Sequence, residues 1–234
     1  MDKENIQKHL GFRWMYQVTS KKPPDPHKSI FRAKKVLAGL VHDMAFLEGN
    51  LFTFPEVQTL LDGVTVGGHK LSDEAQILNT AEAWKLLFRF VENGAFALSK
   101  DIFCKLHQIT AKGEALTLGE FRDGEVGISG TEYKPPQWKE LETLFAEGVL
   151  ALQCIEEEYE RAFAFFLFGA LQQFFWDGNK RTSRLMMAGE LLKHGLDIAS
   201  IPASKKLEFN QKMIRFYDTK DGSEMMKFLE SCVI

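Results

Sequence analysis

Residues 173–184 combine the residue types needed to bind a highly charged ligand. They read Gln-Phe-Phe-Trp-Asp-Gly-Asn-Lys-Arg-Thr-Ser-Arg and lie between two apolar patterns with helical spacing. Gly178 and Asn179 tolerate positive φ angles, so the chain can turn sharply here before a second helix begins. The backbone N–H groups at the start of that helix would then converge on one point, as they do in many anion sites. We therefore interpret the segment as a helix, a short polar loop and a second helix.

The side chains of this loop indicate which anion it would bind. Lys180, Arg181 and Arg184 place three cations within five residues, and Asp177 adds one carboxylate. Several cations beside a single carboxylate suit a polyphosphate carried with Mg²⁺ better than a bare anion. The pattern therefore predicts a nucleoside triphosphate as the ligand. The alternative is a plain turn followed by a solvated, arginine-rich helix start.

The same segment resembles the signature of the Fic family, His-x-Phe-x-(Asp/Glu)-Gly-Asn-(Gly/Lys)-Arg-x-x-Arg. It matches that signature at Phe175, Asp177, Gly178, Asn179, Lys180, Arg181 and Arg184. It departs from the signature at Gln173, which stands where the family has its histidine. The resemblance implies transfer of AMP from ATP to a hydroxyl group of a protein, with Mg²⁺ as the cofactor.

Gln173 matters because the histidine of the family is the general base. An imidazole with a pKa of about 6.5 can accept a proton at neutral pH, whereas an amide cannot. Glutamine can still orient a hydroxyl by hydrogen bonding, but the ~10²–10⁴-fold acceleration that a positioned base supplies would be absent. The resemblance therefore implies an impaired enzyme. The alternative is an inactive domain that binds a nucleotide or a peptide without turnover.

The resemblance also implies a role for each matching residue. Asp177 would hold Mg²⁺, Arg181 would neutralise charge on the leaving group, and Arg184 would bind the γ-phosphate. The residues expected to bind the nucleotide are Gly178, Asn179, Lys180, Arg181 and Arg184. Lys180 stands where most of the family has glycine. The Doc branch also has lysine at this position, so phosphoryl transfer with the nucleotide bound in the opposite sense is a further alternative.

A second acidic position lies at the end of a helix expected to start at Ser29. Glu48 precedes Gly49-Asn50, and a carboxylate at a helix C-terminus opposes the macrodipole by ~0.3–1 kcal/mol unless a cation faces it. Residues 44–50 resemble the inhibitory motif (Ser/Thr)-x-x-x-Glu-(Gly/Asn) of self-inhibited Fic proteins, with Met44 at the Ser/Thr position. The resemblance implies that Glu48 pairs with Arg184 and blocks the γ-phosphate subsite. The alternative is an ordinary helix end at the surface.

Residues 119–136 are expected to form a short β-hairpin beside the loop. Val126 and Ile128 alternate with small or polar residues, and two prolines end the run. The segment resembles the Fic flap, Gly-x-x-Arg-x-x-x-Val-x-Ile-x-Gly-x-x-Tyr-x-Pro-Pro, which holds a loop of the target protein by strand addition. The residues expected to bind a protein target are Val126, Gly127, Ile128, Ser129 and Gly130. A structural hairpin without a partner is the alternative.

The elements that position these segments are expected to be helices. The apolar run 162–170 is shorter than the roughly 20 residues needed to span a bilayer, so it predicts a helix buried at the centre of a domain. We predict a mainly α-helical, single-domain fold with one β-hairpin. We divide the chain into an N-terminal extension (1–27), an inhibitory helix segment (28–52), a Fic-like core (53–196) and a small C-terminal helical lobe (197–234).

Composition limits the partners of this chain. Its 234 residues carry a net charge of −3 and a pI near 6.1, which offers no basic field for a nucleic acid. Three cysteines without metal-ligand spacing, and a charged N-terminus unlike a signal peptide, favour the cytoplasm. We expect no nucleic-acid partner and no membrane contact. The resemblance specifies neither the target protein nor the oligomeric state, and a purely structural helical protein is the last alternative.

Overall fold

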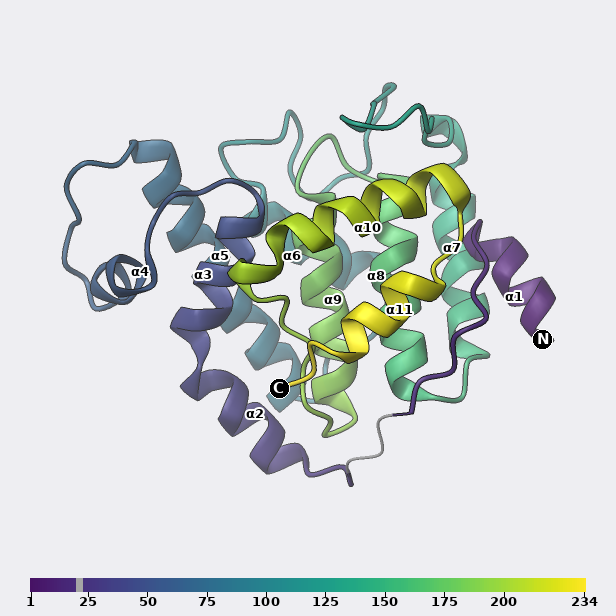
Figure 1. The fold of residues 1–234 in the computed structure, drawn as a ribbon, viewed down its shortest axis with the longest axis horizontal. Helices are drawn as coiled ribbons and strands as arrows, with labels where there is room; N and C mark the ends of the chain where they lie inside the picture. The colour runs from purple at the N-terminus through teal and green to yellow at the C-terminus, as the bar shows by residue number, and fades with distance from the viewer. Residues whose placement is uncertain (20–22) are drawn as a thin grey trace.

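The computed structural model describes residues 1–19 and 23–234 (Figure 1). Eleven α-helices and two short 3₁₀ helices make up the regular elements of these residues. They are α1 (Lys3–Leu10), α2 (Pro26–Lys35), α3 (Leu37–Leu47), α4 (Phe54–Leu61), α5 (Leu71–Glu92), α6 (Lys100–Thr110), η1 (Trp138–Glu140), α7 (Leu141–Gln153), α8 (Glu158–Gln172), α9 (Asn179–Lys193), η2 (Ala203–Lys205), α10 (Lys206–Thr219) and α11 (Ser223–Glu230). The mainly α-helical fold predicted from the sequence is confirmed.

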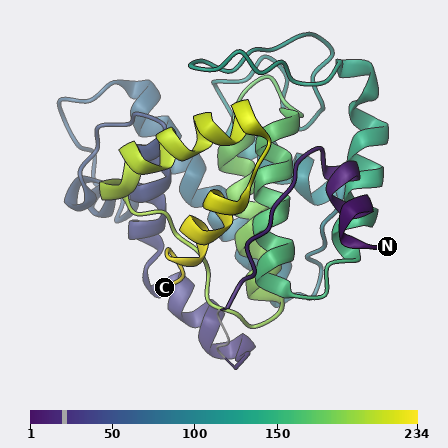
Figure 2. The same ribbon diagram turned by 45° about the vertical axis from the view of Figure 1, so that its right-hand side comes forward.

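Helices α8 and α9 lie side by side at the centre of the molecule (Figures 1 and 2). Every residue of α8 from Ala162 to Gln172 is buried, as the apolar run predicts. Gly169 allows the two helices to approach closely, because a Cβ atom at this position would lie 2.1 Å from Ser183 Oγ. None of the helices in the described ranges is both long and apolar enough to cross a membrane.

The surrounding helices hold this central pair on several sides. Helices α5 and α6 pack against α9, while α7 and α11 pack against α8. Helix α3 packs against α5, so its C-terminal end is fixed relative to the start of α9. Helix α9 begins at Asn179, directly after Gly178. Lys180 and Arg181 are therefore first-turn helical residues.

The helix expected to start at Ser29 is two helices. Helix α2 ends at Lys35, and Val36 separates it from α3. Phe31 and Val36 are apolar but exposed. Val36 has ψ near 17° rather than a helical value, so the two helices run in different directions and the inward face is not continuous. Glu48 nevertheless follows the last residue of α3, where the sequence placed it.

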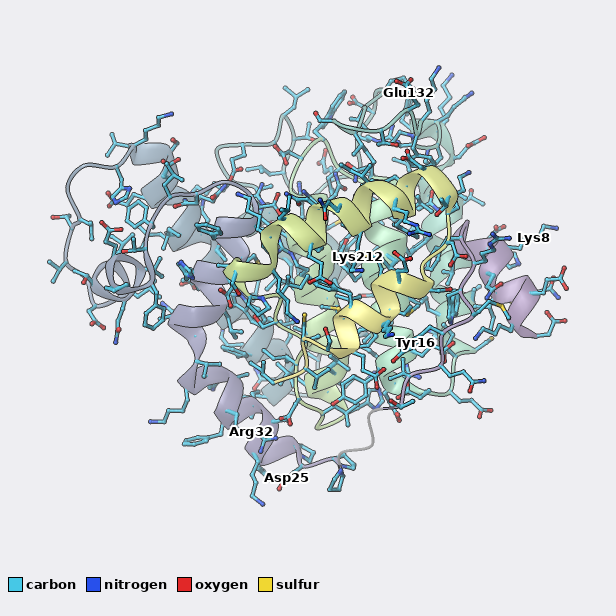
Figure 3. All side chains as sticks on the ribbon, viewed as in Figure 1. Lys8, Tyr16, Asp25, Arg32, Glu132 and Lys212 are labelled. Carbon is cyan, nitrogen blue, oxygen red and sulfur yellow. The ribbon has the colours of Figure 1, made fainter. Side chains whose placement is uncertain are left out.

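The predicted β-hairpin does not form a sheet. Residues 119–137 make an extended loop, which we call the flap, and the described chain contains no β-ladder beyond isolated bridges elsewhere. An isolated two-stranded hairpin is marginal in water, so the loop needs other support. Arg122 provides it, donating hydrogen bonds to the carbonyls of Gln173, Gly124 and Pro136. Glu132, labelled in Figure 3, lies near the outer end of the flap.

The two ends of the chain pack on the same central pair. Helix α1 packs against α7, and the segment after it buries Trp14 in the core. That segment then runs beside α11, where Tyr16 donates a hydrogen bond to Glu230 (Figures 2 and 3). Trp14 is thus a core residue, whereas Met15 is exposed. Residues 20–22 of the predicted N-terminal extension lie outside the described residues.

Candidate functional site

Asn179 shapes the polar loop between α8 and α9. Its Oδ1 accepts a hydrogen bond from the Phe175 N–H at 2.8 Å, and its Nδ2 donates to the Phe175 carbonyl at 2.8 Å. Gly178 has φ near 74°, which is the left-handed conformation that glycine adopts readily. Its N–H donates to Asp177 Oδ1, so in this structure the carboxylate occupies one donor of the expected anion site.

Gln173 ends α8 with both ends of its amide engaged. Its Nε2 donates to the Ala170 carbonyl at 2.6 Å, and its Oε1 accepts from Asn179 Nδ2 at 3.0 Å. The backbone is left-handed, with φ near 50°, and the Gln173 carbonyl accepts a hydrogen bond from Arg122 at 2.7 Å. The side chain is therefore oriented by its neighbours, and it contains no group that titrates near neutral pH.

Glu48 lies against two of the three cations of the loop. Its Oε1 accepts a hydrogen bond from Arg184 Nη2 at 2.6 Å, and its Oε2 is 3.3 Å from Lys180 Nζ. Burial disfavours the charged carboxylate, but the charges of Lys180, Arg184 and Arg181 outweigh it and lower the pKa of Glu48. The contact between Glu48 and Arg184 that the motif implied is present, and its inhibitory role stays a prediction.

Arg181 pairs with a different carboxylate, that of Glu114. Its Nη1 and Nη2 donate to the two oxygens of Glu114 at 2.7 and 2.9 Å, and Nη2 is 3.5 Å from Asp177 Oδ1. Burial opposes the charge of Arg181, but its hydrogen bonds to Glu114 and the charges of Glu48, Glu114 and Asp177 together raise its pKa. Nothing near Glu114 in the sequence suggested this pair.

These groups surround a cavity of about 510 Å³. It opens between the loop, the flap and α10. The lining residues are Glu48, Gly127, Ile128, Ser129, Gln173, Trp176, Asp177, Gly178, Asn179, Lys180, Arg181, Asn210, Met213, Ile214 and Tyr217. Three predicted residues, Val126, Gly130 and Arg184, are not part of this lining, and Arg184 is buried with Glu48 against it. The spacing of Asn210, Met213, Ile214 and Tyr217 on one helix face was the available signal for the α10 wall.

His107 connects the loop to the flap. The Gly119 N–H donates to Nδ1 at 3.1 Å, so Nε2 carries the proton and donates to the Asp177 carbonyl at 3.0 Å. Its ring stacks on Phe175 with centroids 3.7 Å apart. Burial lowers the pKa of His107 to about 4, so the ring is neutral near pH 7. These contacts make His107 a structural residue rather than a base.

The donor set at the cavity suits a metal that arrives with its ligand. Within residues 1–19 and 23–234, no three His, Cys, Asp or Glu side chains converge to hold a metal. Mg²⁺ bound with a nucleotide takes most of its ligands from phosphate and water, together with one or two carboxylates. Asp177 lines the cavity and keeps 58% of its side chain exposed, so it fits that single-carboxylate role.

The fold and the site together define the class of protein. It is a helical domain in which a cation-rich loop between the two central helices faces a flap. Residues 97–191 match the family model described as the Fic/DOC family. The structure is similar to a Fic domain containing signaling protein from Bacteroides thetaiotaomicron, with a TM-score of 0.73, 18% identity, and coverage of 97% of this chain and 92% of that one. It is also similar to Fic-1 from C. elegans, with a TM-score of 0.71, 15% identity, and coverage of 98% and 67%.

Two curated relatives are named Protein adenylyltransferase Fic. The one from Drosophila willistoni is 23% identical over 218 residues, and the one from Drosophila mojavensis is 22% identical over 218 residues. Both alignments cover 89% of this chain, which spans 42% of the length of each relative. These comparisons support a Fic-type domain in this chain, with the family model matching residues 97–191.

Proposed function

We propose that this chain is an ATP-binding Fic domain of the protein adenylyltransferase type, closed to the triphosphate by Glu48 and weakened in transfer by Gln173. One observation carries the proposal. A carboxylate from the end of α3 contacts Lys180 and Arg184 at the edge of a cavity that the flap and Gln173 also line. The names of the two curated relatives support AMP transfer as the ancestral reaction.

The cavity has the size and the polarity that a nucleotide needs. Small-molecule sites usually measure ~300–1,000 Å³ and combine apolar walls with a few polar groups. Met213 and Ile214 of α10 and Ile128 of the flap line the cavity and would offer apolar contacts to the nucleoside. Lys180 and Arg181 of α9 line it as well and would face the phosphates. Asp177 would hold the Mg²⁺, which would draw charge from the phosphate oxygens.

The transfer step needs a proton acceptor that this chain lacks. In AMP transfer, the oxygen of a target hydroxyl bonds to the α-phosphorus, the bond to the bridging oxygen breaks, and pyrophosphate leaves. Arg181 would neutralise the charge that develops on that leaving group. The hydroxyl proton would have to go to water, because the amide of Gln173 does not accept a proton near pH 7. Slow turnover, or binding without turnover, is the expected consequence.

Glu48 would compete directly with the terminal phosphate. Its two oxygens already contact Arg184 and Lys180. A phosphate would otherwise make charge-assisted hydrogen bonds to these same two cations. A carboxylate and a phosphate cannot occupy the same donors. ATP would therefore bind weakly or in an unproductive position until Glu48 moves.

The flap would hold the protein target. No backbone hydrogen bond joins residues 123–136 to another backbone group in the described chain. Gly127, Ile128 and Ser129 line the cavity near Gln173, while Val126 and Gly130 flank them. An extended target segment could pair with these free backbone groups, so that its hydroxyl lies beside the α-phosphate.

Titration with ATP tests the proposal. Replacing Glu48 in Glu48→Gly frees Arg184 and Lys180, so ATP should bind at least about tenfold more tightly than to the parent chain, and Mg²⁺ should be required. Glu120→Gln is the control, because it removes an exposed acid that is not part of the cavity lining. Equal ATP affinity in the parent and in Glu48→Gly would overturn the inhibitory role. No ATP binding by either protein would overturn the proposed function.

The three cysteines are free thiols, which supports the proposal of a reducing, cytoplasmic setting.

A further inference from the structure

Arg181 and Glu114 form the most complete charge pair at the cavity. Two parallel hydrogen bonds of 2.7 and 2.9 Å join the guanidinium to the carboxylate, and Nη1 also donates to the Thr110 carbonyl at 3.3 Å. Arg181 is 3% exposed at its side chain, whereas Glu114 is 28% exposed. Bidentate pairs of this kind determine the plane of the guanidinium as well as its position.

Glu114 is itself held in place by its own loop and by α5. It lies just after α6, where the Glu114 N–H donates to the Ala111 carbonyl at 3.0 Å. Its Oε2 accepts a hydrogen bond from Gln76 Nε2 of α5 at 3.1 Å. The carboxylate is therefore attached to two elements that do not belong to α9. Arg181 is fixed relative to the body of the domain rather than only to its own helix.

The two carboxylates that face the arginines differ in their position. Glu48 lines the cavity and holds Arg184 and Lys180, so a terminal phosphate that is to reach these cations must displace it. Glu114 is absent from the lining, whereas Arg181 belongs to it. Glu114 thus contacts Arg181 from outside the cavity. The Arg181 Nε atom is buried and has no hydrogen-bond partner among the described residues, so the two bonds to Glu114 and the bond to Thr110 are what hold the guanidinium.

We propose that Glu114 is a positioning residue for Arg181: it orients the guanidinium toward the phosphates of a bound nucleotide and stays in place when the ligand enters. This inference rests on the proposed function. It gives the two carboxylates opposite effects. Removing Glu48 should strengthen nucleotide binding, because it vacates the cavity. Removing Glu114 should weaken it, because Arg181 loses the partner that holds its plane, even though the site becomes more positive.

The test compares two nucleotides in the Glu48→Gly background. Glu114→Gln should weaken binding of ATP with Mg²⁺ by about tenfold, because one charge-assisted pair that positions Arg181 is lost. AMP lacks the phosphates that Arg181 would contact, so its affinity should change less than about twofold. Glu120→Gln, which removes an exposed acid from the same loop, should leave both affinities unchanged. Glu114→Asp keeps the charge but not the reach, and should recover only part of the ATP affinity.

Each other outcome overturns the inference in a different way. Tighter ATP binding in Glu114→Gln would make Glu114 a second inhibitory carboxylate. Equal losses for ATP and AMP would show a merely structural role. Full recovery by Glu114→Asp would show that charge alone matters. If the Glu48→Gly protein alone binds neither nucleotide, the proposed function fails and this inference fails with it. If that protein binds ATP and Glu114→Gln does not weaken the binding, only this inference fails.

Discussion

Gln173 lies in a backbone conformation that a histidine can also adopt. Its φ is near 50°, and Asn, Asp and His are the residues other than glycine most often found there. The position lines the cavity and follows the last turn of α8, so a replacement side chain would face the same space. On the proposed function, supplying a general base would therefore need a change of one side chain, since Asn179 and Arg122 already hold the surrounding loop.

Restoring the histidine should restore transfer. In the Glu48→Gly background, Gln173→His should increase AMP incorporation into the chain or a target by ~10²-fold or more, because a positioned base becomes available. Mass spectrometry of the intact protein after incubation with ATP and Mg²⁺ measures the adduct. Gln173→Asn is the control, since it supplies an amide without a base. An adduct of phosphate instead of AMP would indicate the Doc-like reaction. No adduct in Gln173→His would favour a domain that only binds.

Glu48 should also contribute to stability, and the contribution should depend on pH. Its pKa is lowered in the folded state, so the contribution is complete above the unfolded value of 4.5 and is lost as pH falls through the lowered pKa. Glu48→Gln should lower the free energy of unfolding at pH 7 by about 3 kcal/mol, because Arg184 stays buried without its carboxylate. Urea unfolding of both proteins measures the difference. It should shrink below pH 4.5, and a difference that stays constant with pH would contradict this origin.

Sequence motifs predicted the residues of the site better than their surroundings. Glu48 and Arg184 could be paired because each belongs to a short pattern at a helix end. Glu114 could not be predicted, because it lies 67 residues from Arg181 and its loop carries no pattern. The α10 wall could not be predicted either, since an apolar helix face has the same pattern whether it contacts a core or a ligand.

At the scale of elements, α10 links the cavity to the helix that carries Glu48. Its first residue, Lys206, donates to the Phe46 carbonyl at 2.8 Å, and its Nζ lies 5.0 Å from the centre of the Phe46 ring. Phe46 is in the last turn of α3, where a cation offsets the helix macrodipole. The later turns of α10 carry Asn210 and Tyr217, which line the cavity. One helix therefore contacts both the ligand space and the support of Glu48.

Lys206→Met should loosen the end of α3 and so weaken the hold of Glu48 on the cations. ATP should bind about two- to fivefold more tightly, which corresponds to the ~0.3–1 kcal/mol of a cation at a helix end. The same substitution in Glu48→Gly should change nothing, because no carboxylate is left to release. Lys212→Met, on the same helix, is the control for charge. Isothermal titration of the parent, Lys206→Met, Glu48→Gly and the double variant measures the coupling. An equal gain in both backgrounds would mean that Lys206 acts on ATP without Glu48.

The flap shows where patterning at the element scale misleads. Alternation of Val126 and Ile128 predicted two paired strands, but the pairing needs cross-strand hydrogen bonds that a short isolated hairpin seldom keeps. The buried guanidinium of Arg122 instead ties both ends of the flap to the carbonyl of Gln173. The sequence could predict that the segment is extended and close to the loop, but not that a single side chain would replace the ladder.

At the scale of the whole molecule, the geometry of the site depends on the spacing of two helices. Helix α8 ends at the cavity with Gln173, and α9 begins there with Lys180 and Arg181. Their separation is set within the core, where Gly169 meets Ser183. A fold that is helical and buried at this point could be predicted from the apolar run, since almost every side chain of α8 faces a neighbour. The close approach of α8 and α9 depends on Gly169, and the sequence alone does not show which element packs against that glycine.

Gly169→Ala tests this dependence. The added Cβ would lie 2.1 Å from Ser183 Oγ and 3.0 Å from Ser183 Cβ, so the Ser183 hydroxyl must rotate and α9 must shift slightly away from α8. Overpacking of this kind should lower the free energy of unfolding by about 3 kcal/mol. Gly39→Ala in α3 is the matched control, because its Cβ would meet no atom within 4 Å and alanine favours a helix by ~0.5–1 kcal/mol. Urea unfolding of the two variants should therefore give shifts of opposite sign. In the Glu48→Gly background, Gly169→Ala should also weaken ATP binding, because Gln173 and the cations of α9 move relative to one another. Unchanged stability and ATP affinity in Gly169→Ala would mean that the α8–α9 spacing does not determine the geometry of the site.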